Sequence, residues 1–295
     1  MQSRSLMEVA RGRVVLTDGG IGTELQRAGL EPGGCGECWN ADRPDRVSAI
    51  HRAYAEAGAE ALLTNTFGGS RIALDRHGAG DRARELNRAA AALARGAAGD
   101  GWVLGDIGPF GGFLEPLGEH PADVVESAFR EQAEALLEGG ADGLLVETMT
   151  ALDELALAVR AGKAAGAPFV IASVAFDATK VGPRTMMGVA PEAAAAAALD
   201  AGADALGANC GTGLGMAGYA DVLRRYRDVA PDTVLLCRPN AGTPRVEGQA
   251  VVYDLTPERM ATEVGLLADA GATVIGGCCG TTPAHIAAMQ PVLGA

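Results

Sequence analysis

Three cysteines are the residues of this 295-residue chain best suited to chemistry. Cys278 and Cys279 are adjacent in a glycine-rich segment, and Cys210 follows a short apolar run upstream. Two neighbouring cysteines cannot easily bond to each other without strain. Three thiolates that meet at one point would bind zinc and leave one coordination position open, as catalytic zinc sites do. The pattern therefore predicts a Zn²⁺ ion held by Cys210, Cys278 and Cys279.

The alternative reading of these cysteines is a set of three buried core thiols. It is disfavoured because the cysteines lie in glycine-rich turns and not inside apolar runs. Adjacent residues of a regular strand point to opposite faces, so Cys278 and Cys279 reach one ion only if the chain leaves strand geometry there. Gly276, Gly277 and Gly280 provide that freedom.

A second group of residues has the chemistry to bind an amino acid. The segment 18–24 reads DGGIGTE and follows the first apolar run. Backbone N–H groups near Gly19 and Gly20, at the start of a helix, would bind a carboxylate. Asp18 and Glu147, each after an apolar run, would bind an ammonium. The alternative for this segment is an ordinary helix start with a tight turn, because a lone glycine cluster is weak evidence.

Other polar segments also follow apolar runs, at 65–68, 106–109 and 238–242. Each is compatible with ordinary turn chemistry. Asn240 differs from the rest because its amide oxygen is able to occupy an open metal position weakly. Asn240 is therefore a candidate labile fourth ligand.

The remaining cysteines and histidines are not needed for such a site. Cys35 and Cys38 form a Cys-x-x-Cys pair, but no second pair completes a four-thiol site and no strand precedes them, so two incidental loop cysteines are favoured. Cys237 lies inside an apolar run and is expected to pack in the core. His51 and His285 fall in stretches with helical patterns.

The elements that must position these residues alternate along the chain. Pro44, Pro121 and Pro191 begin helical stretches that end near glycines, as helices commonly do. Eight short apolar runs, rich in branched residues, suit strands buried on both faces. They span 14–16, 61–63, 102–104, 143–146, 169–171, 205–207, 234–236 and 273–275.

Eight strands that alternate with helices predict an α/β fold, a single (β/α)8 TIM barrel over residues 1–295 with the zinc site at its C-terminal face. A doubly wound open sheet is the alternative, disfavoured because polar residues follow nearly every strand and not only those at one switch point. The net charge of −13 argues against nucleic acid as a partner. No apolar stretch reaches membrane-spanning length and the N-terminus lacks a signal-peptide core, so we expect a cytoplasmic protein with no membrane contact.

With these residues assembled, the chain resembles the homocysteine S-methyltransferase family. The segments that carry the resemblance run from 18–20 through 64–68, 147–148 and 207–210 to 277–283. The resemblance implies a (β/α)8 barrel and zinc bound by Cys210, Cys278 and Cys279. It also implies homocysteine bound near Asp18, Gly19, Gly20 and Glu147, with Thr66 and Asn209 close by.

The resemblance implies transfer of a methyl group to the homocysteine thiol, which gives methionine. Segments 65–67, 239–242 and 280–286 are most similar to the N-terminal module of cobalamin-dependent methionine synthase. The resemblance implies that an asparagine matching Asn240 can occupy the open zinc position when substrate is absent. We expect no folate-binding or cobalamin-binding module of that enzyme here, so the donor stays open among betaine, S-methylmethionine, another sulfonium and a methylated corrinoid protein.

Three other functions remain open from the sequence. The same site could act on another thiol or on selenohomocysteine. A different barrel enzyme, an aldolase or isomerase, would bind phosphate with the loop 276–282 and hold no metal. A zinc-binding accessory or sensor protein would bind zinc without turnover.

Overall fold

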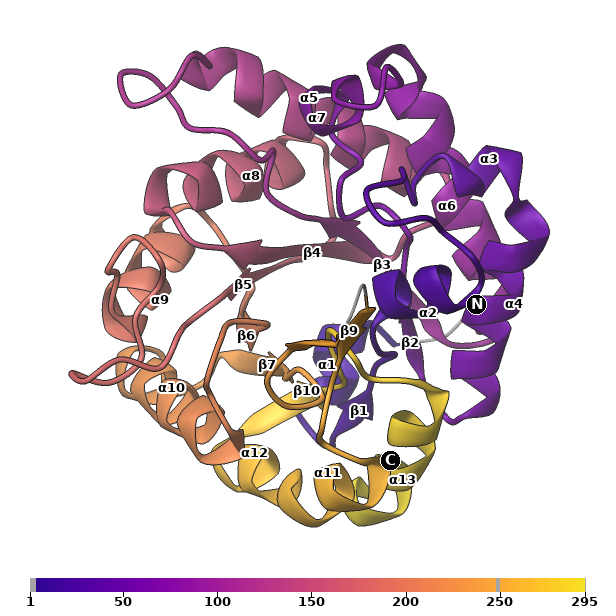
Figure 1. Ribbon diagram of the computed structural model, residues 1–295. Helices are drawn as coiled ribbons and strands as arrows, with labels where there is room; N and C mark the ends of the chain where they lie inside the picture. The colour runs from indigo at the N-terminus through magenta and orange to yellow at the C-terminus, as the bar shows by residue number, and fades with distance from the viewer. Residues whose placement is uncertain (1–3, 248–249, 295) are drawn as a thin grey trace.

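The computed structural model describes residues 4–247 and 250–294 and shows a parallel sheet curled into a barrel, with helices around it (Figure 1). The strands follow the order β1-β10-β7-β6-β5-β4-β3-β2, and every neighbouring pair is parallel. Their bounds are β1 Val15–Leu16, β2 Ala61–Leu63, β3 Trp102–Ile107, β4 Gly143–Met149, β5 Val170–Val174, β6 Ala205–Asn209, β7 Val234–Arg238 and β10 Ala272–Ile275.

A parallel bridge between Thr17 and Ala61 connects the two edge strands β1 and β2. The backbone N–H of Asp18 donates to the Ala61 carbonyl over 3.1 Å at the same junction. The sheet therefore closes on itself, and the (β/α)8 prediction is confirmed over the open sheet. All eight predicted runs are strands, and several strands continue further than predicted, through the polar residues that follow each run.

Helices fill the connections and form the outer ring seen in Figure 1. The three helices predicted from proline and glycine are confirmed as α4, α7 and α9. The helices of the described residues are α1 Leu6–Ala10, α2 Ile21–Arg27, α3 Trp39–Asp42, α4 Pro44–Glu56, α5 Arg71–Asp75, η1 Gly80–Arg82, α6 Ala83–Ala98, α7 Ala122–Glu138, α8 Leu152–Ala164, α9 Pro191–Asp200, α10 Met216–Val229, α11 Pro257–Glu263, α12 Gly265–Asp269 and α13 Pro283–Leu293.

Residues of alternate register fill the interior of the barrel, because side chains of a strand point to opposite faces in turn. Trp102 and Leu104 of β3 belong to this interior cluster, as do Leu145 of β4 and Leu236 of β7. Helix α1 adds apolar side chains to the same cluster. Continuing the period of two along β3, β4 and β7 places Asp106, Glu147 and Arg238 next on the interior face, at the carboxyl ends of these strands.

A short antiparallel hairpin was not predicted from the sequence. Strands β8 (Arg245–Glu247) and β9 (Ala250–Val252) pair with each other, and β9 lies across the barrel mouth in Figure 1. Tyr253 follows the hairpin and packs on Gly280, where an added Cβ would lie 2.2 Å from the tyrosine ring. Among the helices that the structure describes, none is both long enough and apolar enough to cross a membrane.

Candidate active site

The three predicted cysteines meet at the carboxyl ends of β6 and β10. The sulfurs of Cys210, Cys278 and Cys279 all lie within 4.8 Å of one another, and those of Cys278 and Cys279 are 4.0 Å apart. Zn–S bonds of about 2.3 Å in tetrahedral geometry place ligand sulfurs about 3.8 Å apart. The cluster therefore has the donor atoms and the spacing of a three-thiolate metal site.

Local backbone geometry turns these sulfurs toward one another. Cys210 follows the last residue of β6 and has φ +52°, a left-handed conformation that non-glycine residues adopt rarely and mostly at functional or strained positions. Cys278 and Cys279 come after β10 has ended, as the strand argument required. The N–H of Gly277 donates to the Asp18 carbonyl and that of Cys278 to the Pro239 carbonyl, over 3.0 and 2.8 Å.

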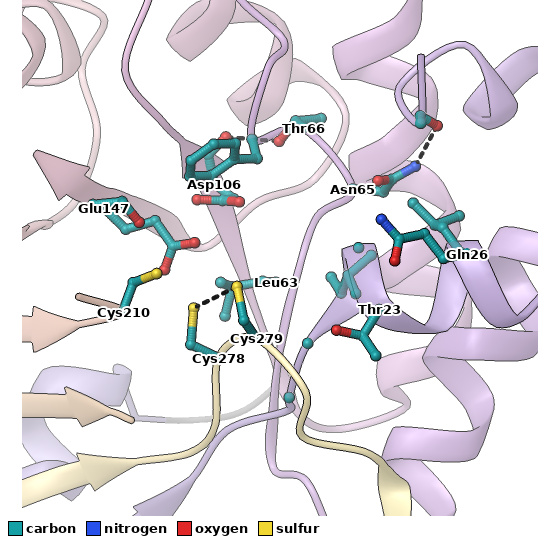
Figure 2. A pocket seen from close by; sticks show the side chains of 18 of the residues that line it. Thr23, Gln26, Leu63, Asn65, Thr66, Asp106, Glu147, Cys210, Cys278 and Cys279 are labelled. Atoms are coloured by element: carbon teal, nitrogen blue, oxygen red, sulfur yellow. Dashed lines mark hydrogen bonds between the residues drawn. The ribbon is translucent and has the colours of Figure 1, made fainter. Parts of the chain in front are cut away.

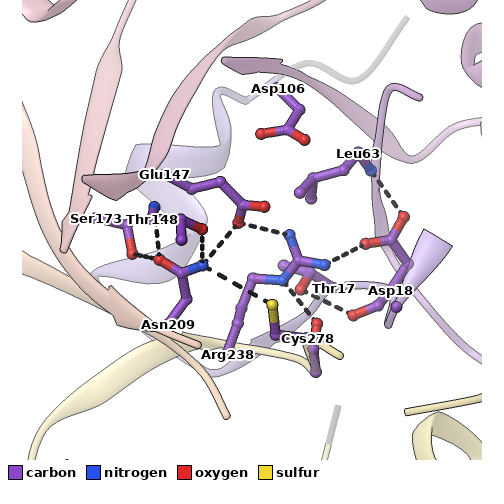
Figure 3. Close-up of polar contacts among 12 residues, drawn as sticks. Thr17, Asp18, Leu63, Asp106, Glu147, Thr148, Ser173, Asn209, Arg238 and Cys278 are labelled. Atoms are coloured by element: carbon purple, nitrogen blue, oxygen red, sulfur yellow. Dashed lines mark hydrogen bonds and ion pairs between the residues drawn. The ribbon is translucent and has the colours of Figure 1, made fainter. Parts of the chain in front are cut away.

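Arg238, at the end of β7, organises the polar layer beneath the cysteines. Its guanidinium is almost fully buried and forms ion pairs with Asp18 (3.1 Å) and Glu147 (3.5 Å). It also donates to the carbonyls of Gly277 (3.0 Å) and Gly19 (3.1 Å). One side chain thus joins the carboxyl ends of β1, β4, β7 and β10 (Figure 3).

Asn209 is the second hub of this layer. Its amide nitrogen donates to Thr148 Oγ1 (2.7 Å) and to Glu147 Oε2 (3.3 Å), and it lies 3.9 Å from Cys278 Sγ. Its amide oxygen accepts from Ser173 Oγ (2.6 Å) and from the Thr148 N–H (3.0 Å). Asn209 is fully buried, so it orients Glu147 and does not itself line the pocket.

Thr66 holds the backbone of Asp106. Its hydroxyl donates to the Asp106 carbonyl over 2.7 Å and lies 2.6 Å from the Thr64 hydroxyl, which accepts from the Asp106 N–H over 2.9 Å. Gln132 of α7 donates to the carbonyls of Thr66 and Asp106. The backbone of Asp106 is therefore anchored on both sides, while its carboxylate enters the pocket (Figure 2).

Burial dominates the electrostatics of the carboxyl groups. It raises the pKa of Asp18 and of Glu147 to about 7, although the positive charge of Arg238 opposes the shift. Burial, with a contribution from the charge of Glu147, raises the pKa of Asp106 well above its ordinary range. Among the thiols, hydrogen bonds from Cys278 and Cys279 lower the pKa of Cys210 to about 3. Burial thus favours the protonated forms of these carboxyl groups, and a cation beside them would favour the ionised forms.

A pocket of about 400 Å³ connects these groups and is large enough for a small-molecule ligand. The cysteines and Glu147 lie on one side of it, and Thr23 and Gln26 of α2 lie on the other (Figure 2). Gly20 approaches the cysteine loop so closely that an added Cβ would lie 2.7 Å from the Cys278 carbonyl. The glycine at this position is therefore required for the pocket wall.

The structure places most of the predicted site residues at this pocket. Gly19, Gly20, Thr66, Glu147 and the three cysteines line it. Asp18 does not, because its two carboxylate oxygens accept from Arg238 and from the Leu63 N–H (2.8 Å) inside the protein.

Asn240 lies beside the cysteine cluster. Its amide nitrogen donates to the Gly211 carbonyl over 3.0 Å and is 3.8 Å from Cys210 Sγ. Its amide oxygen is buried and has no hydrogen-bond partner in the described part of the chain. A role as labile fourth ligand stays a prediction, and this uncommitted oxygen is consistent with it.

The other cysteines lie elsewhere. Cys35 and Cys38 are partly buried in the segment between α2 and α3 and pack against a small cluster that includes Leu86. Cys237 is fully buried in β7, as predicted. Burial raises the pKa of its thiol above the ordinary range.

Two residues of the site were not predicted from the sequence as site residues. Arg238 and Asp106 were treated as parts of turn motifs, yet both lie inside strands and point into the barrel. Alternation from Leu236 and Leu104 would have indicated their inward direction. An isolated charged residue at the end of an apolar run, as in the segment 234–238, is the sequence signal that would have indicated a site residue.

Comparison with known proteins decides the family. Residues 15–293 match the family described as homocysteine S-methyltransferase. The chain belongs to this family. It is 39% identical to methionine synthase of Mycobacterium tuberculosis over an alignment of 303 residues. The alignment covers 95% of this chain and 25% of that protein. It is 38% identical to methionine synthase of Mycobacterium leprae, covering 95% and 24%. The chain thus spans about a quarter of the length of these curated relatives.

Solved structures agree with the fold. The metallated form of the homocysteine methyltransferase MmuM from Escherichia coli matches with a TM-score of 0.78 and 23% identity, over 96% of this chain and 98% of that one. The carboxyl transferase domain of Rhizobium etli pyruvate carboxylase with pyruvate matches with a TM-score of 0.55 and 16% identity, over 97% and 48%. At these identities the likeness concerns the barrel alone.

Proposed function

We propose that this barrel transfers a methyl group to the thiol of L-homocysteine, with Zn²⁺ bound by Cys210, Cys278 and Cys279. The observation that carries the proposal is the convergence of three cysteine sulfurs at the edge of a pocket. The pocket also holds the carboxyl group of Asp106, whose Oδ1 has no hydrogen-bond partner in the described part of the chain. Family membership supports the substrate, and the metallated MmuM relative supports a metal. When bound, zinc would lower the pKa of a substrate thiol so that it is a thiolate near neutral pH.

The residues of the chain orient the substrate for an in-line attack. The amino-acid end would lie against the wall formed by Gly19 and Gly20 and against Glu147, with its thiol toward the cysteines. Asp18 would act indirectly, by fixing Arg238, and Asn209 by fixing Glu147. The homocysteine sulfur then forms a bond to the donor's methyl carbon while the donor's bond to that carbon breaks, and the thiol proton passes to solvent. Holding the sulfur in place supplies much of the rate enhancement.

The phosphate-binding alternative fits the loop 276–282 poorly. The N–H groups of Gly276, Gly277 and Cys278 donate to backbone carbonyls of the protein. Those of Gly280 and Thr282 donate to side chains of other residues. With these five N–H groups already bonded, the loop offers little to an anion, and any ionised carboxylate below it would repel one.

The pocket beside the cysteines also favours an enzyme over a zinc sensor, since a sensor needs no space for a thiol substrate. The methyl donor is open among betaine, S-methylmethionine, another sulfonium and a methylated corrinoid protein, and selenohomocysteine remains an alternative acceptor. A cytoplasmic location is part of the proposal, supported by six cysteines that are all free thiols.

The test combines metal content with turnover. Cys278→Ala is expected to lose stoichiometric zinc and methyl transfer, measured by atomic absorption and by methionine formation with each donor in turn. Cys237→Ala is the matched control, because this buried thiol lies outside the cluster, and it should retain both. Full zinc content and full activity in Cys278→Ala would overturn the proposal. Zinc binding by the wild type without homocysteine affinity would indicate the sensor instead.

A further inference from the structure

The carboxylate of Asp106 is the least explained polar group of the pocket. Asp106 is only 4% exposed, and its Oδ1 has no hydrogen-bond partner among the described residues. Figure 3 shows the carboxylate above Glu147 and Arg238 without a contact to either. A buried carboxylate without a partner is costly, so its retention at a pocket wall indicates a ligand that pairs with it.

The position of this carboxylate is built into the protein. Asp106 continues the interior face of Trp102 and Leu104 at the end of β3. The hydroxyls of Thr64 and Thr66 bind its N–H and its carbonyl, respectively. The backbone cannot rotate the side chain out of the pocket without breaking both contacts.

The charges around it are unbalanced. When all three ionise, the acids Asp18, Asp106 and Glu147 outnumber Arg238, the one cation of the layer among the described residues. Arg238 is already paired with Asp18 and Glu147. A positive group of the ligand would therefore complete the layer next to Asp106 and the pocket-facing oxygen of Glu147.

We propose that Asp106 binds the α-ammonium of the amino-acid substrate, together with Glu147. This inference rests on the proposed function, because it takes homocysteine as the ligand. Asp18 cannot perform this task, since its two oxygens are bonded to Arg238 and Leu63. An ammonium has three N–H donors for the free oxygens of two carboxylates, whereas a methylated sulfonium or quaternary ammonium has none. The substrate amine is therefore the better partner than the cation of a methyl donor.

The test compares two thiols that differ by the amine alone. L-homocysteine and 4-sulfanylbutanoate are titrated calorimetrically into the zinc-loaded full chain, as wild type and as Asp106→Asn, which keeps the shape and removes the charge. Asp106→Asn is expected to weaken homocysteine binding about ten- to hundred-fold, in keeping with the loss of a charged hydrogen bond. Its affinity for 4-sulfanylbutanoate should stay within about two-fold of the wild type, because that ligand has no ammonium.

Asp204→Asn is the matched control, because Asp204 accepts from the Val170 N–H and from Lys163 at the opposite end of the barrel. It should leave both affinities unchanged. Unchanged homocysteine affinity in Asp106→Asn, or an equal loss for both thiols, would overturn the assignment alone. A loss confined to the KM of a cationic donor would assign Asp106 to the donor and also overturn it. If the wild type binds no homocysteine, the proposed function fails and the assignment fails with it.

Discussion

Replacement of Arg238 by methionine should destabilise the fold far more than loss of a surface arginine. Arg238 and its partner carboxylates of Asp18 and Glu147 are almost completely buried. The substitution leaves two buried carboxylates without a cation and frees the carbonyls of Gly19 and Gly277. Removing one member of a buried ion pair costs about 3–5 kcal/mol, so we expect a loss of that size in the free energy of unfolding.

The matched control is Arg84→Met. Arg84 also pairs with two carboxylates, Glu134 and Glu138, but all three side chains are about half exposed. Solvent screens such pairs, so we expect Arg84→Met to change the free energy of unfolding far less than Arg238→Met. The contrast between the two arginines therefore isolates burial as the cause.

The measurement is urea unfolding of both variants with the metal removed by chelation, so that zinc affinity does not enter the comparison. Arg238→Lys covers the case in which the methionine variant does not fold. Lysine keeps the charge but lacks the planar fork that reaches several acceptors, so it should lie between methionine and the wild type. A loss below about 1 kcal/mol for Arg238→Met, or equal losses at positions 238 and 84, would refute the reasoning.

Two further perturbations test the folded core. Burial lowers the pKa of His51 to about 4 from 6.5, so the unfolded chain takes up this proton first as the pH falls. The free energy of unfolding should therefore fall between pH 6.5 and pH 4, by at most about 3 kcal/mol, because only the unfolded chain binds this proton readily. Urea unfolding of His51→Leu over the same pH range should not show this fall. Parallel pH profiles for the two proteins would contradict this. In Gly96→Ala the added Cβ on α6 meets no atom within 4 Å, so this substitution should stabilise the protein by about 0.5–1 kcal/mol. In Gly143→Ala the added Cβ would lie 2.3 Å from the Phe169 ring, so this substitution should destabilise the protein. A thermal scan that shows the two alanines shifting the midpoint in the same direction would count against the packing argument.

Much of the architecture was predictable because it depends on local patterns. Short branched apolar runs and proline-to-glycine helices recur often enough to indicate eight strand–helix units, and all eight strands are present. The hairpin β8–β9 was missed although β9 reads AVV, because its partner strand β8 reads RVE and has no apolar run that would indicate a second strand. Its place over the barrel mouth depends on contacts such as that of Tyr253 with Gly280, which are distant in sequence.

The sequence by itself predicted that Cys210, Cys278 and Cys279 form one cluster, and the structure brings their sulfurs within 4.8 Å of one another. It also determined which end of the barrel carries the site, because polar residues follow the strands. Only the tertiary structure decided which acid pairs with Arg238 and which acid faces the pocket without a partner. Asp18 and Asp106 look equivalent in the sequence, each at the end of an apolar run. Arg238, 220 residues from Asp18, pairs with that carboxylate and leaves Asp106 unpaired. Coulombic pairing depends on distance in space and on burial, and no local pattern contains either.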